Sequence, residues 1–184
     1  MNKKIISLLL ALTVCITFLA ACGKESDDDG FFPSFETETI DGEKVTDKIF
    51  QGNKVTMVNV WGTFCSPCIN EMPDLEKLSE AYKEKGVRVI GIVSDTYDIY
   101  SKENLPDMIQ EAKDIITQTG VTYTNLLPSA SLNKAKLDII FSVPTTYFLD
   151  ENGEIIGIEF VGSRSYEQWS AILDGILNLE TPTE

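Results

Sequence analysis

A short, almost wholly apolar segment that leads directly into an amphipathic helix is the feature that most restricts the fold of this chain. Residues 55–61 read Val-Thr-Met-Val-Asn-Val-Trp and are followed by Gly62. A run so rich in β-branched and large apolar side chains predicts a strand that is buried on both faces. Apolar residues then recur at helical spacing from Met72 to Tyr82, until Gly86 ends the run. The segment therefore predicts a buried strand followed by a helix.

The same alternation continues toward the C-terminus. Residues 87–93 predict a second buried strand, and residues 108–120 predict an amphipathic helix. Residues 145–149 and 154–160 predict a hairpin around an Asp-Glu-Asn-Gly turn, and residues 169–177 predict a last helix. Strands that alternate with helices in this way form α/β sheets. We therefore expect an α/β protein with a thioredoxin-like fold, in which helices flank a central mixed β-sheet.

Two further segments complete the expected fold. The Asp-Gly turn signal within residues 40–45 predicts an N-terminal hairpin extension. Between residues 122 and 142 the pattern is weaker, and it indicates a short strand at 125–127 and a helix near 131–137.

The N-terminus has the pattern of a secreted lipoprotein. Lys3 and Lys4 precede an apolar stretch that ends in Leu-Ala-Ala-Cys, with small residues before Cys22. This order predicts a signal peptide over residues 1–21 and a lipid on the Cys22 sulfur. The alternative is an uncleaved membrane span, which needs about 20 apolar residues, whereas this run is shorter and contains Ser and Thr. With either alternative, the remaining chain is expected outside the cytoplasm and held at the cell membrane.

The rest of the chain is expected to be one domain behind a spacer. Residues 22–30 are small and acidic and predict a flexible linker, and residues 31–180 predict the thioredoxin-like domain. Removing residues 1–21 from the 184 would leave 163 residues, which suffice for one domain with its own core. The formal net charge of −14 argues against nucleic acid as a partner. We expect a monomer.

The number and spacing of the cysteines limit the chemistry that this chain can carry out. Of the four cysteines, Cys15 would be removed with the signal peptide and Cys22 would carry the lipid. Cys65 and Cys68 therefore remain and must function as a pair. In an oxidising compartment, such a pair is a structural disulfide, a metal site or a redox centre. Structural zinc sites use four ligands, mostly cysteine and histidine, and the chain has no histidine. A disulfide across two residues closes too small a loop to stabilise the fold much. A redox centre is favoured, without a metal or another cofactor.

The predicted position of this pair assigns a role to each sulfur. Cys65 lies where a helix begins, and the free N–H groups there favour a thiolate, so its pKa should lie below the roughly 8.5 of a free thiol. Cys65 is therefore the expected nucleophile, and Cys68 is expected to resolve the mixed disulfide. Glu71 follows Cys68 by three residues and lies on the same side of the helix. It could accept and return the proton of Cys68; the alternative is a solvated helix glutamate.

These residues carry a family resemblance. Residues 58–73, Val-Asn-Val-Trp-Gly-Thr-Phe-Cys-Ser-Pro-Cys-Ile-Asn-Glu-Met-Pro, resemble the active-site stretch of the TlpA/ResA family. Residues 42–45 resemble the hairpin of that family, and residues 142–148, Ser-Val-Pro-Thr-Thr-Tyr-Phe, resemble its cis-proline loop. The resemblance extends over nearly all of the expected domain. Phe64 departs from the tryptophan that is common before the first cysteine.

The resemblance implies further site residues. Pro144 would follow a cis peptide bond and face the cysteine pair, and the backbone of Val143 would bind the substrate chain as a short added strand. ResA-type members carry an active-site glutamate at the position of Glu71. Asn59 stands where thioredoxins have a buried aspartate, which makes Glu71 a more plausible proton carrier.

The resemblance also implies a function. TlpA/ResA-like lipoproteins usually reduce disulfides outside the cytoplasm with electrons from a membrane thiol transporter of the CcdA/DsbD kind. Oxidised partners would be secreted or surface proteins, including apocytochrome c in cytochrome c biogenesis or a methionine sulfoxide reductase. A disulfide-forming oxidase on the same fold and a non-enzymatic chaperone or ligand-binding lipoprotein are the alternatives. A peroxiredoxin is excluded, because the Pro-X-X-X-Thr-X-X-Cys signature is missing before Cys65.

Overall fold

The structure, a computed structural model, describes residue 32 and residues 34–180. The predicted signal peptide (1–21), the predicted linker (22–30) and Cys22 lie outside the described residues. Within the described part, no helix has the length and apolar character that a membrane crossing needs.

Strands and helices follow one another as the sequence predicts. The N-terminal half contains β1 (Glu36–Glu38), β2 (Lys44–Thr46), η1 (Asp47–Phe50), β3 (Val55–Trp61), α2 (Ser66–Tyr82), η2 (Lys83–Lys85) and β4 (Val87–Val93). The C-terminal half contains β5 (Tyr97–Asp98), β6 (Glu103–Asn104), α3 (Pro106–Thr119), β7 (Thr124–Leu126), α4 (Ala130–Ala135), η3 (Leu137–Ile139), β8 (Thr145–Leu149), β9 (Phe160–Val161) and α5 (Tyr166–Glu180).

A five-stranded mixed sheet forms the centre of the domain, with the strand order β7-β4-β3-β8-β9. Strand β4 runs parallel to β3 and to β7, whereas β8 runs antiparallel to β3 and to β9. Val58 of β3 stands opposite Ile90 of β4 on one side and Tyr147 of β8 on the other. The predicted thioredoxin-like fold is confirmed. So is the N-terminal hairpin, because β1 and β2 pair antiparallel around a turn in which Gly42 has a φ of 89°.

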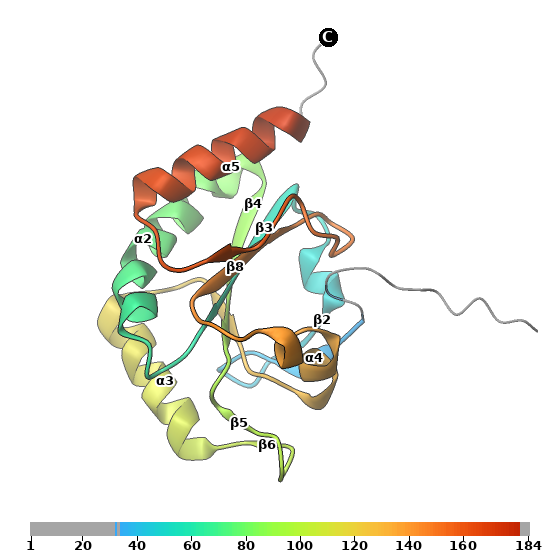
Figure 1. The fold of residues 1–184 in the computed structure, drawn as a ribbon, viewed down its shortest axis with the longest axis vertical. Helices are drawn as coiled ribbons and strands as arrows, with labels where there is room; N and C mark the ends of the chain where they lie inside the picture. The colour runs from blue at the N-terminus through green and yellow to red at the C-terminus, as the bar shows by residue number, and fades with distance from the viewer. Residues whose placement is uncertain (1–31, 33, 181–184) are drawn as a thin grey trace, which may run out of the picture.

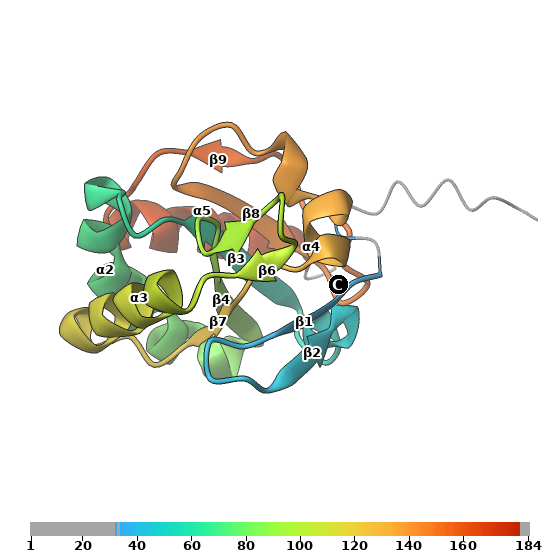
Figure 2. The ribbon, with the colours of Figure 1, turned by 90° about the horizontal axis from the view of Figure 1, so that it is seen from below.

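Two layers cover the sheet, as Figures 1 and 2 show. Helices α2, α3 and α5 pack on one face, and the N-terminal segment with η1 and α4 packs on the other. Alternate side chains of a strand point to opposite faces. Met57 and Trp61 accordingly join the core under the helices, and Val58 and Val60 join the core under the N-terminal segment. Strand β3 is therefore buried along its whole length, which explains its predominantly apolar sequence.

One predicted strand is mostly absent. Residues 154–160 do not form the expected second strand of a hairpin: Ile155 makes a single bridge to Leu149, and β9 is confined to Phe160–Val161. Gly157 explains the interruption, because its φ of 81° turns the backbone out of the extended conformation. The Asp-Glu-Asn-Gly turn itself is present.

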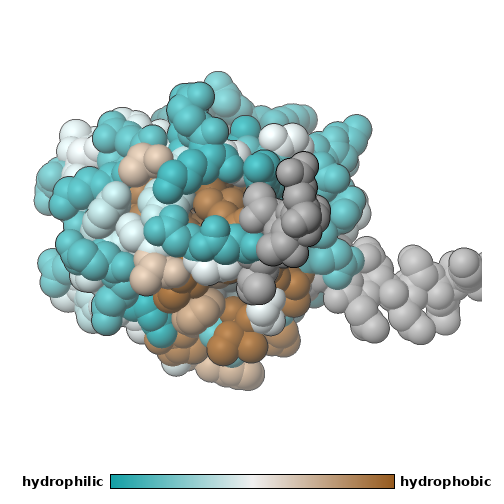
Figure 3. Space-filling view, turned by 90° about the horizontal axis from the view of Figure 1, so that it is seen from above, coloured by the Kyte–Doolittle hydropathy of each residue, from teal (hydrophilic) through white to brown (hydrophobic). Residues whose placement is uncertain are grey.

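The surface at the α5 end is shown in Figure 3. Most of this face is hydrophilic, and hydrophobic residues gather at its lower edge, on the side where β9 ends the sheet. The exposed large apolar residues of that part of the chain are Ile155, Ile158 and Val161.

Candidate active site

The cysteine pair lies where β3 passes into α2. Cys65 is the N-cap of α2, and its sulfur is joined to that of Cys68 in a disulfide. The backbone N–H of Cys68 donates to Cys65 Sγ over 3.2 Å. First-turn N–H groups have no intrahelical acceptor and favour negative charge, so they stabilise a thiolate on Cys65 after reduction. Cys68 is fully buried and Cys65 is 6% exposed, which makes Cys65 the more accessible sulfur.

The loop before β8 lies against the cysteine pair. The Val143–Pro144 peptide bond is cis, as the resemblance predicts. The carbonyl oxygen of Val143 lies 3.6 Å from Cys65 Sγ, although the two residues are 78 positions apart in the sequence. The structure thus brings the predicted substrate-binding loop and the nucleophile together.

The turn before Cys65 is tied to the end of β4. The backbone N–H and the hydroxyl of Thr63 both donate to Asp95 Oδ2, over 2.9 and 2.7 Å. Phe64 follows Thr63 and is 73% exposed beside the disulfide. Sequence analysis missed Asp95. Its position just after a buried strand of the parallel pair was the available signal, because ligand sites in such sheets lie at the carboxyl ends of the strands.

Glu71 is a buried carboxyl group on the second turn of α2, 4% exposed. Its Oε2 accepts the backbone N–H of Arg164 over 3.1 Å, and its Oε1 accepts from Asn59 Nδ2 over 3.0 Å. Burial raises the pKa of Glu71 from 4.5 to about 7, against the lowering effects of Arg164, Trp169 and Asn59. The indole nitrogen of Trp169 makes no hydrogen bond of normal geometry within the part of the chain that the structure describes, although Trp169 is among the residues that lower this pKa.

This environment decides what Glu71 can do. A group with a pKa of about 7 holds and releases a proton at neutral pH, as a general acid and base must. The alternative of a solvated helix glutamate does not fit its burial. Asn59 holds the carboxyl group from β3 and also donates to Thr146 Oγ1 over 3.0 Å.

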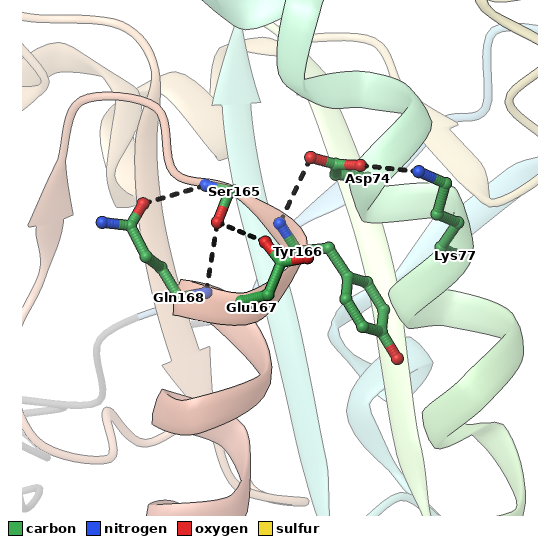
Figure 4. A network of polar contacts seen from close by, with 6 residues as sticks. All are labelled: Asp74, Lys77, Ser165, Tyr166, Glu167 and Gln168. Atoms are coloured by element: carbon green, nitrogen blue, oxygen red, sulfur yellow. Dashed lines mark hydrogen bonds and ion pairs between the residues drawn. The ribbon is translucent and has the colours of Figure 1, made fainter.

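The donor Arg164 directly precedes the residues at the start of α5, whose polar contacts Figure 4 shows. The backbone N–H of Ser165 donates to Gln168 Oε1, and that of Gln168 donates to Ser165 Oγ, so the two residues form a capping box. The next N–H, that of Tyr166, donates to Asp74 Oδ2 on α2 over 3.2 Å. These contacts fix the backbone beside Glu71. Arg164 lies 93 positions after Glu71, and no local pattern in the sequence indicates the contact.

Other features of the described part do not join this site. A cavity of about 760 Å³ lies between the β1–β2 hairpin and the β5–β6 hairpin, and neither cysteine nor Glu71 lines it. The described residues contain no cluster of three or more metal-binding side chains. Cys22, the predicted lipid site, lies outside the described residues.

Comparison with known proteins gives concordant results. Residues 26–171 match the sequence profile of the Redoxin family. Thiol-disulfide oxidoreductase ResA of Bacillus anthracis is 31% identical over 153 residues, which cover 82% of this chain and 76% of the relative. Thioredoxin-like protein YneN of Bacillus subtilis is 31% identical over 142 residues, 77% of this chain and 76% of the relative.

Solved structures resemble the fold as well. A thiol:disulfide interchange protein from Chlorobium tepidum TLS is 27% identical with a TM-score of 0.63, and the match covers 79% of this chain and 94% of that protein. StoA from Bacillus subtilis is 26% identical with a TM-score of 0.56, and the match covers 76% of this chain and 95% of that protein.

Proposed function

The chain belongs to the Redoxin family and, within it, to the ResA-like thiol-disulfide oxidoreductases, and we propose that it reduces disulfides of proteins outside the cytoplasm. The observation that carries the proposal is the placement of Cys65 at the N-cap of α2, within 3.6 Å of the Val143 carbonyl oxygen. A thiolate favoured at this position would meet a substrate chain that binds along Val143.

The proposed reaction starts from the reduced pair. The Cys65 thiolate attacks one sulfur of the target disulfide, so a Cys65–target bond forms, the target S–S bond breaks, and the leaving sulfur takes up a proton. The Cys68 thiolate then attacks Cys65 Sγ, which forms the Cys65–Cys68 disulfide and releases the second target sulfur as a thiolate. Two electrons pass from the pair to the target. The Cys65–Cys68 disulfide in the structure corresponds to the oxidised state that the pair reaches at the end of this reaction.

In this scheme, Glu71 accepts and returns the proton of the Cys68 thiol. Cys68 is fully buried, so its thiol has little contact with bulk water. Glu71 lies one helical turn further along α2, with a pKa raised to about 7 by burial. It removes the proton of Cys68 before the resolving step and returns a proton when the pair is reduced again.

We propose that a signal peptide over residues 1–21 exports the chain and that a lipid on Cys22 holds it at the cell membrane. Support comes from the order of charged, apolar and small residues at the N-terminus. A membrane thiol transporter of the CcdA/DsbD kind would return electrons to the pair, and oxidised secreted or surface proteins, apocytochrome c among them, would receive them.

The reduction potential of the pair tests the direction of electron flow. Equilibration of the purified protein with glutathione or dithiothreitol mixtures should give a value near or below about −250 mV, as in reductases of this fold. A value near −120 mV would instead support the oxidase alternative, because strong oxidants such as DsbA have such potentials. Cys65→Ala should abolish disulfide exchange in the same preparation, and activity that survives this change would refute the assigned nucleophile.

A further inference from the structure

A groove of about 310 Å³ opens beside the cysteine pair, between the turn before Cys65, the segment after β4 and the segment around η3. Its lining residues include the apolar Phe64, Ile99, Leu137 and Val143 and the acidic Asp95 and Asp138. We call it the acidic groove. Its volume is at the lower end of the range of ligand pockets, about 300 to 1,000 Å³, so it suits one or two side chains of a bound chain.

The acidic groove adjoins the reacting sulfur at two points. Phe64 is the residue before Cys65, and the Val143 carbonyl oxygen lies 3.6 Å from Cys65 Sγ. A polypeptide whose cysteine reacts with Cys65 therefore places the neighbours of that cysteine within reach of the groove.

The walls of the acidic groove are apolar and open to solvent. Phe64 is 73% exposed and Ile99 is 66% exposed. Large apolar side chains gathered at an open site usually mark a contact surface for a partner. Ile99 belongs to the short β5–β6 excursion between β4 and α3, which the sequence pattern did not predict.

The charges in the acidic groove are of one sign. No Lys or Arg is among its lining residues, and Asp95 and Asp138 both contribute carboxylates. Thr63 holds Asp95 Oδ2 with two hydrogen bonds, which fixes the orientation of the carboxylate. The second oxygen, Asp95 Oδ1, is buried and has no hydrogen-bond partner among the described residues. Asp95 therefore contributes a fixed negative charge from within the wall, whereas the side chain of Asp138 is exposed and can contact a cationic group of a bound chain directly.

We infer that the acidic groove selects protein disulfides in which a Lys or Arg residue lies next to the target cysteine. The inference rests on the proposed function and names the substrate class of the same site. The methylene groups of a long basic side chain would pack on Phe64 and Ile99, and its charged head would contact the exposed carboxylate of Asp138 and be attracted by the nearby charge of Asp95, as such side chains commonly divide between apolar and polar surroundings. An acidic neighbour would meet two carboxylates of its own sign and be disfavoured.

Matched peptides test the charge preference directly. Three peptides share one intramolecular disulfide and differ only in the residues that flank the cysteines, which are Arg, the uncharged isostere citrulline, or Glu. The reduced full-length protein is mixed with each peptide, and kcat/KM is followed by Trp fluorescence or by thiol release in a coupled assay. The Arg peptide should react about fivefold faster than the citrulline peptide, the effect of one partly exposed ion pair, and the Glu peptide should be slowest. Hydroxyethyl disulfide, which has no flanking residues, reports the redox chemistry alone.

Variants of the two groove carboxylates test whether the preference for basic flanking residues arises in the acidic groove. The double variant Asp95→Asn with Asp138→Asn should bring the Arg-to-citrulline rate ratio close to one. A matched double variant, Asp107→Asn with Asp114→Asn, removes two exposed carboxylates from α3, which does not line the groove, and should keep the ratio. Because each variant is judged by a ratio between two peptides, partial damage to folding or to the thiol chemistry cancels.

The outcomes are distinct. A parent protein that reduces all three peptides equally would overturn the acidic groove as a selector while leaving the proposed function intact. The same conclusion would follow from a preference that survives the groove variant or is lost equally in the α3 variant. A parent protein that reduces neither the peptides nor hydroxyethyl disulfide would overturn the proposed function and this inference with it.

Discussion

Replacement of Glu71 by Gln should remove a pH-dependent loss of stability between pH 5 and 8. The pKa of Glu71 is about 7 in the folded protein and 4.5 without the fold. Between these values the unfolded chain has released the proton while the folded chain still binds it, so stability falls as the pH rises. Below pH 4.5 both states hold the proton and the effect vanishes. Above pH 7 the loss is complete, and the 2.5-unit difference corresponds to about 3 kcal/mol.

The folded protein can accommodate the neutral amide of the variant. Asn59 Nδ2 donates to Glu71 Oε1, and Asn59 Oδ1 is buried without a hydrogen-bond partner among the described residues. Rotation of the Asn59 amide would present this oxygen to the new NH₂ group, and the Thr146 hydroxyl could then donate to the same oxygen. The remaining side-chain oxygen of the variant would still accept from the backbone N–H of Arg164.

Urea unfolding of the oxidised protein at pH 5, 6, 7 and 8 measures the effect. The unfolding midpoint of the parent should fall relative to that of Glu71→Gln by about 1 to 2 M urea between pH 5 and 8, since m-values are about 1 to 3 kcal/mol/M. Glu84→Gln, at an exposed position of η2, is the control and should follow the parent. Parallel curves for the parent and Glu71→Gln would refute the argument that burial holds the proton on Glu71.

Three more changes test other parts of the structure. Cys68→Ser should accumulate mixed disulfides with natural partners on non-reducing gels and Cys65→Ser should not, because only Cys65 attacks first; equal trapping by both would contradict these roles. Gly91→Ala should lower the free energy of unfolding by about 1 to 3 kcal/mol, measured by urea melts, because the added Cβ would clash with Asn125 Oδ1 in the core. An unchanged midpoint would show that Asn125 moves freely. Cys22→Ala should shift the protein out of the membrane fraction while disulfide exchange by the purified protein persists; loss of that exchange would contradict the separation of anchor and site.

The redox pair and its surroundings along the chain were predictable because the forces that set them are local. The strands at 55–61 and 87–93 have the predicted bounds, since segments rich in β-branched and large apolar residues are stable in a sheet covered on both faces. Cys65 was expected where a helix begins, and it is the N-cap of α2. The exception at 154–160 is also local, because a single glycine with positive φ interrupts a pattern that otherwise favours a strand.

The environment of the pair depended on contacts that no local pattern records. The spacing of Glu71 from Cys68 made it a candidate, but its raised pKa results from burial in the folded protein. The groups that bind its carboxyl group come from β3 and from the segment before α5, and the second of these lies 93 positions away. The acidic groove likewise joins Asp95, Phe64 and the η3 segment. Local sequence patterns were sufficient to identify the residues that could carry the redox chemistry, because periodicity and helix capping act over a few residues. The proton affinity of Glu71 and the charge beside Cys65 follow from the packing of distant segments, because desolvation and charge proximity depend on which of them come together.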